Sequence, residues 1–243
     1  MKYLTIPFIF IISTLSLYSN NKIQWFTKKI NQIQSLKTIK ADIEQKIVSN
    51  DKGSEIFKGR YRADSYGNIR IDYFFPKKMI VFCNSKGIYW FYPQNKIVYY
   101  SSSVSKKSMI PNKLNIILPG DRYKIIYFGK DKIDLFTSVK VFKIRDIINK
   151  SSLFYYLDFQ TGIVLQKRVV DSENRELIKE IYGKYKKIKS IDIPHQVDVR
   201  VRTENGIVKN ITEYKNIIVN GNINKRIFQI NFPSDVEWRK FDE

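Results

Sequence analysis

Residues 57–92 read FKGRYRADSYGNIRIDYFFPKKMIVFCNSKGIYWFY, and this stretch decides the fold class. Apolar and charged residues alternate along residues 69–73, which is the period of a strand with one buried face. Turn sequences interrupt the pattern at residues 65–68, 76–78 and 84–87. Connections this short cannot hold crossover helices, so the stretch predicts an antiparallel meander.

The same alternation extends to both sides of this stretch. Upstream it reaches residue 39 and downstream residue 101, which predicts a meander of six strands. Further strands are expected at residues 122–129, 132–146, 153–159, 163–171, 176–189, 195–203, 206–216 and 226–231. Before the meander, apolar residues at helical spacing predict a long amphipathic helix over residues 22–36.

These elements predict an α+β fold within a single domain over residues 21–243. A long N-terminal helix is expected beside a strongly curved, half-open antiparallel β-barrel of about 10–12 strands with short lid helices. A sheet of this size does not always fill its interior with side chains, so it can hold an apolar ligand.

The first 20 residues have the layout of a secretory signal peptide. Lys2 precedes an uncharged apolar run from Leu4 to Leu17, and small and polar residues follow it. The run is short for a membrane span, which needs about 20 residues, although an uncleaved anchor is the alternative. The signal predicts an exported, soluble protein. No cysteine lies near the expected cleavage region, so we expect no N-terminal lipid.

The chain of 243 residues carries a formal net charge of +20. Three interpretations compete: nucleic-acid binding, attraction to anionic membranes, and a general bias of composition toward Lys, Ile and Asn. The export signal argues against nucleic acid as a partner. Lysines are spread along the whole chain, which favours the compositional interpretation but leaves the membrane open.

Residues typical of catalysis and metal binding are scarce. His195 is the single histidine and Cys83 the single cysteine, so neither a zinc cluster nor an intrachain disulfide is expected. Nucleotide-binding and nucleophile motifs are also missing from the sequence. We therefore expect neither an enzyme nor a bound cofactor.

Two sets of apolar residues are candidates for a site that holds an apolar ligand, although plain core packing explains them equally well. The inner face of the meander predicts a cavity lined by Ile43, Ile47, Phe57, Tyr61, Ile69, Ile71, Tyr73, Ile80, Phe82, Tyr89 and Phe91. A proline-flanked segment predicts a lid made of Met109, Ile110, Leu114, Ile117 and Leu118. Trp90 has no assigned face.

The order of several short motifs resembles that of the outer-membrane lipoprotein carrier (LolA) family. These motifs are Ser35-Leu36-Lys37-Thr38, residues 41–46, Phe57-Lys58-Gly59, residues 69–73 with Pro76, Tyr89-Trp90-Phe91-Tyr92-Pro93, residues 156–158 with 161–162, and residues 228–233. The series covers nearly all of the chain after residue 20. Where family members often carry an Arg-Pro pair, this chain has Ser65-Tyr66, which puts the family's lid control in doubt.

The resemblance implies a monomeric periplasmic chaperone that carries the acyl chains of lipoproteins from the inner to the outer membrane. Its implied partners are lipoproteins, an inner-membrane ABC-type lipoprotein-releasing complex and an outer-membrane acceptor. A lipid-sensing or lipoprotein-sensing regulatory module, or a carrier of another lipid, stays open as an alternative on the same fold.

Overall fold

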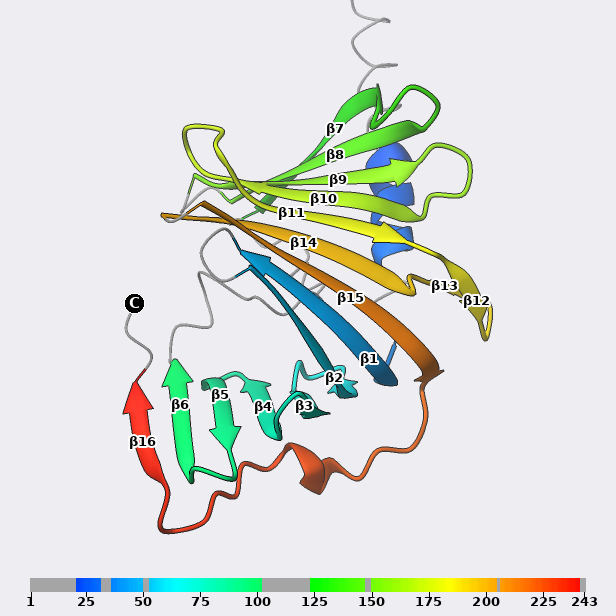
Figure 1. Cartoon of the computed structure of the whole chain (residues 1–243). Helices are drawn as coiled ribbons and strands as arrows, with labels where there is room; N and C mark the ends of the chain where they lie inside the picture. The colour runs from blue at the N-terminus through cyan, green and yellow to red at the C-terminus, as the bar shows by residue number, and fades with distance from the viewer. Residues whose placement is uncertain are drawn as a thin grey trace, which may run out of the picture. The chain divides into compact units, whose positions relative to one another are not determined.

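The computed structural model describes residues 21–31, 36–49, 53–101, 123–146, 150–204 and 206–240 (Figure 1). The chain divides into two compact units. Unit 1 combines Met1–Gln32 with Ile116–Glu176, and unit 2 combines Ile33–Asn115 with Leu177–Glu243. The expected signal peptide, residues 1–20, lies outside the described residues, and the single domain stays a prediction.

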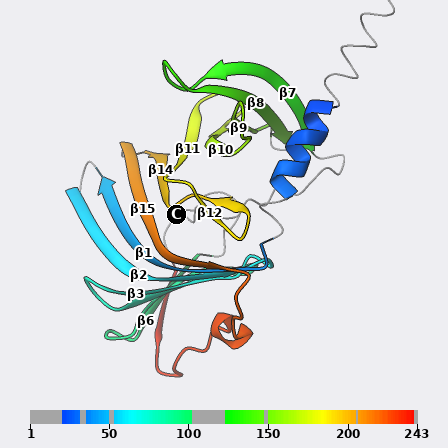
Figure 2. The same cartoon turned by 90° about the vertical axis from the view of Figure 1, so that its right-hand side faces the viewer.

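Unit 2 is built on a bent antiparallel sheet whose strand order does not close on itself (Figure 2). Neighbouring strands follow the order β16-β6-β5-β4-β3-β2-β1-β15-β14-β11, in which only β16 runs parallel to its partner among the described pairs. The bounds are β1 Thr38–Ser49, β2 Gly53–Asp64, β3 Ile69–Phe75, β4 Met79–Asn84, β5 Gly87–Tyr92, β6 Ile97–Ser101, β11 Glu176–Gly183, β14 Gln196–Thr203, β15 Gly206–Val219 and β16 Glu237–Lys240. The short strands β12 Lys186–Ile188 and β13 Ile191–Ile193 pair separately.

The predicted six-stranded meander is confirmed as β1 to β6, each strand paired with the next. The predicted strand at residues 226–231 is wrong. A 3₁₀ turn, η1 Lys225–Phe228, occupies its first half, because the Asn224 side chain caps the turn by accepting a hydrogen bond from the Arg226 amide at 3.0 Å. The last strand is β16 instead, which adds to the edge of β6.

The segment between η1 and β16 packs across one face of the meander instead of pairing with it. The Phe232 ring lies 5.2 Å from Phe91 and 5.9 Å from Phe82, measured between ring centroids. Trp238 also lies 5.2 Å from Phe232. We call this covered side the strap face of the unit 2 sheet. Edge-to-face and tilted aromatic packing of this kind holds Phe232 on the sheet without strand pairing.

Unit 1 holds the N-terminal helix against the antiparallel strands β10, β9, β8 and β7, which are neighbours in that order (Figure 2). Its strands are β7 Tyr123–Lys132, β8 Ser138–Asp146, β9 Ser152–Asp158 and β10 Val164–Val170. Phe26 and Ile30 of the helix are fully buried, and the Phe26 ring stacks on Phe142 with centroids 4.4 Å apart. Among the described residues, no helix is long and apolar enough to cross a membrane.

The helix is shorter than predicted. Its described part covers residues 21–31, and Leu36 already lies outside it. The backbone beyond Leu36 is held in extended form, because the Lys37 amide donates to Asn220 Oδ1 at 2.7 Å and Thr38 Oγ1 donates to the Gly221 carbonyl at 2.7 Å. The apolar spacing that suggested a helix up to residue 36 therefore crosses from the helix into the approach to β1.

Phe26→Ala should remove about 3–5 kcal/mol from the free energy of unfolding, since it empties a fully buried aromatic site. Urea denaturation followed by tryptophan fluorescence measures this change. Phe136→Ala is the matched control: that side chain is 93% exposed and its loss should change stability by less than about 0.5 kcal/mol. Equal losses in the two variants would show that the helix does not hold unit 1 together.

Candidate ligand cavity

A cavity of about 140 Å³ lies within unit 2 against strands β1 to β5 and β15. Most of its wall is apolar or aromatic, and a few polar groups lie at one side. The lining residues are Ile43, Gln45, Ile47, Phe57, Tyr61, Ile71, Tyr73, Met79, Val81, Ile88, Trp90, Asn210, Thr212 and Tyr214. The composition matches that of small-molecule sites, which combine apolar walls with few polar groups.

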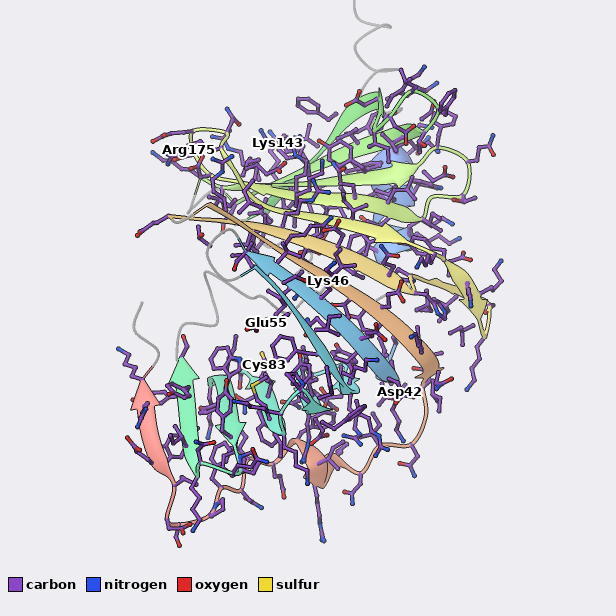
Figure 3. The ribbon with its side chains drawn as sticks, viewed as in Figure 1. Asp42, Lys46, Glu55, Cys83, Lys143 and Arg175 are labelled. Atoms are coloured by element: carbon purple, nitrogen blue, oxygen red, sulfur yellow. The ribbon has the colours of Figure 1, made fainter. Side chains whose placement is uncertain are left out.

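Strand register brings these residues onto one side of the sheet. Tyr61 pairs with Ile71, Ile71 with Val81, and Val81 with Trp90. Paired residues in adjacent strands point to the same face, so the four side chains form a continuous row across β2 to β5. We call this side the cavity face. Asp42 and Lys46, labelled in Figure 3, occupy the alternate positions of β1 and belong to its other side.

A chain of hydrogen bonds crosses the cavity face. The Tyr73 hydroxyl donates to Gln45 Oε1 at 2.5 Å, and Gln45 Nε2 donates to Thr212 Oγ1 at 3.3 Å. Thr212 Oγ1 donates in turn to Asn210 Oδ1 at 3.2 Å. Burial raises the pKa of Tyr73 well above its ordinary value, so the phenol keeps the proton that it donates. The buried side chains of Tyr73, Gln45 and Thr212 thus have hydrogen-bond partners within the chain.

Gly59 makes room for this arrangement. It lies on β2 between Ile43 of β1 and Tyr73 of β3, with which it is paired. A Cβ atom at this position would lie 2.8 Å from the Asp72 carbonyl oxygen and 3.1 Å from Tyr73 Cδ1. Contacts so short require the backbone or the ring to shift. The missing side chain therefore lets the Tyr73 ring lie over β2 and reach Gln45 on β1.

The predicted cavity residues divide between the two faces of the sheet. Those that line the cavity are Ile43, Ile47, Phe57, Tyr61, Ile71 and Tyr73. Ile69 is buried on the same face but outside the lining set. Those that lie on the strap face are Ile80, Phe82, Tyr89 and Phe91, because Ile80 pairs with Phe91, Phe82 pairs with Tyr89, and all four alternate with cavity residues. The predicted lid residues Met109, Ile110, Leu114, Ile117 and Leu118 lie outside the described residues.

Several lining residues are not predicted by the sequence pattern. They are Gln45, Met79, Val81, Ile88, Trp90, Asn210, Thr212 and Tyr214. Register across the β3–β4 turn accounts for Met79 and Val81, since Tyr73 pairs with Met79. The β15 residues have a different cause: β15 pairs with β1, which is far away in the sequence, and no local pattern reveals that pairing.

Other chemistry is sparse in the part of the chain that the structure describes. Those residues contain no group of three or more His, Cys, Asp or Glu side chains that could hold a metal ion. Cys83 is a buried thiol. Arg62 and Arg70 both pair with Asp72, and Arg70 Nη2 lies 2.7 Å from Asp72 Oδ1. Asp72 offsets one of the two positive charges, and all three side chains lie on the side opposite the cavity.

Comparison with known proteins identifies the fold. No protein-family model and no curated protein sequence matches the chain. Among solved structures, a DUF1329 family protein from Desulfovibrio piger has a TM-score of 0.63 at 14% identity, covering 84% of this chain and 94% of its own. A LolA superfamily protein from Nitrosomonas europaea has a TM-score of 0.60 at 11% identity, covering 85% and 97%. An outer membrane lipoprotein-sorting protein domain from Vibrio parahaemolyticus scores 0.62 at 12% identity, covering 84% and 94%.

Tyr73→Phe should lower the free energy of unfolding at pH 7 by about 1–3 kcal/mol, because Gln45 loses its donor in a buried site. The raised pKa of Tyr73 adds a dependence on pH. Above about pH 10 the unfolded state releases this proton and the folded state retains it, so the wild-type protein loses stability as pH rises. Tyr73→Phe should lose stability less steeply between about pH 9 and 11.

Denaturation curves at a series of pH values measure both effects. Tyr66→Phe serves as the control, since Tyr66 is 74% exposed and its substitution should leave the curves unchanged. An alkaline slope that is identical in Tyr73→Phe and the wild type would contradict a buried, protonated phenol.

Proposed function

Since the chain has the LolA-like fold, we propose that it binds acyl chains of lipids or lipoproteins in the cavity of unit 2. In this proposal it acts in the periplasm as a carrier of lipoproteins from the inner to the outer membrane. Its donor is an inner-membrane ABC-type lipoprotein-releasing complex, and an acceptor at the outer membrane takes the cargo. The resemblance of the sequence motifs to the carrier family and the fold of the lipoprotein-sorting domain support this role.

The observation that carries the proposal is the apolar cavity itself. Ile43, Ile71, Val81 and Ile88 supply aliphatic wall, while Trp90 adds a large aromatic surface. Burying methylene groups against such a wall contributes about 0.8 kcal/mol for each CH₂. Binding needs no covalent step and no cofactor.

The size of the cavity sets how a chain is held. An engineered apolar cavity of about 150 Å³ binds benzene, so about 140 Å³ suits a few methylene groups. The rest of a long acyl chain would extend beyond this wall. A modest binding energy favours reversible transfer, since a carrier must release what it binds.

The hydrogen-bonded polar groups lie at one side of the cavity, so the two ends of a ligand would meet different surroundings. Asn210 and Thr212 lie on β15, at the opposite side from the Val81 and Trp90 wall. Hydrogen-bonding groups favour the ester or amide end of a lipid, and the aliphatic wall favours its tail. This asymmetry suits an amphiphile better than a plain hydrocarbon.

Ile71→Glu should lower the affinity for a fluorescent fatty acid by about tenfold or more, since it places a carboxylate on the apolar wall. Fluorescence titration of the purified protein measures this affinity. Ile218→Glu makes the same exchange at a 53%-exposed position of β15 outside the lining set, and it should bind as the wild type does.

Circular dichroism shows whether each variant is folded. If Ile71→Glu does not fold, Ile71→Trp fills the cavity without adding charge and should also weaken binding. Unchanged affinity in a folded Ile71 variant would exclude this cavity as the binding site. Mass spectrometry of lipids that co-purify with the wild type identifies the cargo.

A further inference from the structure

The turn between β7 and β8 in unit 1 exposes two adjacent large apolar side chains. Leu135 is 81% exposed and Phe136 is 93% exposed. Single exposed apolar residues are common on protein surfaces. A Leu-Phe pair at the tip of a hairpin instead forms one continuous apolar patch. Neither side chain is needed to bury the core of unit 1, whose cluster is formed around Val139, Val141 and Tyr156.

Polar contacts hold this turn in shape without help from the apolar pair. Asp134 Oδ1 accepts hydrogen bonds from the amides of Phe136 at 2.8 Å and Thr137 at 2.7 Å, and Asp134 Oδ2 accepts one from Thr137 Oγ1 at 2.9 Å. The Ile133 amide also donates to the Thr137 carbonyl at 3.2 Å. A fixed turn presents Leu135 and Phe136 outward at little entropic cost when they are buried by a partner.

Lysines gather at the base of the same turn. Lys130 and Lys140 are directly paired across β7 and β8, and Lys132 ends β7. The pKa of Lys140 is lowered, first by burial and then by the nearby charges of Lys22, Lys130 and Lys29. Like charges within reach of one another create a positive field at this end of unit 1.

The nearby carboxylates have structural roles in the turns. Asp158 accepts from the Thr161 amide at 2.7 Å and from Thr161 Oγ1 at 2.6 Å, which shapes the β9–β10 turn. Asp131 Oδ1 accepts from the Lys132 amide at 2.8 Å, and Asp134 shapes the apolar tip itself. Their charges reduce the positive field, and that of Asp158 acts on Lys140 directly. With Lys22 and Lys29 of the helix, the five lysines outnumber these three carboxylates, so the field stays positive.

We propose that the β7–β8 turn docks on an anionic phospholipid bilayer, with Leu135 and Phe136 entering the lipid and the lysines meeting the headgroup phosphates. The surface of an anionic bilayer has negatively charged headgroups above an apolar interior. When the apolar tip enters the interior, the lysines behind it lie at the level of the headgroups. The docking surface belongs to unit 1 and shares no residue with the cavity of unit 2. It gives the chain a means of approaching a membrane that does not use the ligand site.

Vesicle co-sedimentation tests the docking surface with protein purified from the soluble fraction of cells expressing the full chain. Wild type should bind phosphatidylglycerol vesicles more strongly than phosphatidylcholine vesicles, and binding should fall as salt rises. The double variant Leu135→Ser with Phe136→Ser should bind about tenfold less or weaker. Lys130→Gln with Lys132→Gln should bind less and depend less on salt.

Matched controls place the same exchanges elsewhere. Tyr66→Ser removes an exposed aromatic side chain from unit 2, and Lys86→Gln with Lys186→Gln removes two exposed lysines. Both should bind vesicles as the wild type does. The proposal is overturned if the wild type does not bind phosphatidylglycerol vesicles, if it binds both lipids equally, or if the Leu135/Phe136 variant equals the wild type.

The same Leu135/Phe136 variant separates membrane docking from the proposed function. In solution, without vesicles, it should bind the fluorescent fatty acid with wild-type affinity, because the cavity residues are untouched. Loss of vesicle binding with retained fatty-acid binding supports the docking surface alone. Loss of both in a folded variant would overturn the separate roles of the two units.

Discussion

Pairing of Tyr73 with Met79 across the β3–β4 turn fixes which side chains of the meander reach the cavity. Side chains alternate along a strand, so one residue of shift in this turn would exchange the two faces of both β4 and β5. With the observed register, Val81 and Trp90 join the cavity face. Their neighbours lie on the strap face, where Phe232, in the segment between η1 and β16 that we call the strap, covers Phe82 and Phe91.

The sequence predicts β1 to β3 well and assigns β4 and β5 to the wrong phase for the same physical reason. In residues 69–73 a charged residue occupies each position that points away from the cavity face, so the buried face is evident. Residues 79–83 are apolar at every position, because one face borders the cavity and the other is covered by the strap. In a strand that is buried on both sides, every position is apolar, so the sequence pattern does not show which side chains point to which face. The strap itself depends on contacts between distant parts of the chain, and no local pattern predicts them.

Gly59 leaves the space in which the hydrogen-bonded polar groups of the cavity come together. An ordinary side chain there would push the Tyr73 ring from its place over β2 and separate its hydroxyl from Gln45. Gln45 would then retain only its bond to Thr212 in a buried site. The polar chain is therefore a single unit that reaches from β3 to β15, and it needs a glycine on the strand it crosses. This requirement gives a structural reason for the Phe57-Lys58-Gly59 motif.

Apolar side chains are covered in the cavity of unit 2 and exposed at the β7–β8 turn of unit 1. The cavity keeps them covered and offers a small volume, which would limit how tightly it holds a proposed acyl-chain ligand. The turn leaves them uncovered, although Asp134 gives it enough polar support that Leu135 and Phe136 contribute nothing to its shape. Exposed apolar surface raises the risk of aggregation, so a fold retains it more readily where it serves contact with another apolar phase. In the two proposals, weak retention of the ligand and contact with a bilayer are complementary, because an acyl chain released near a membrane has only a short aqueous path to cross.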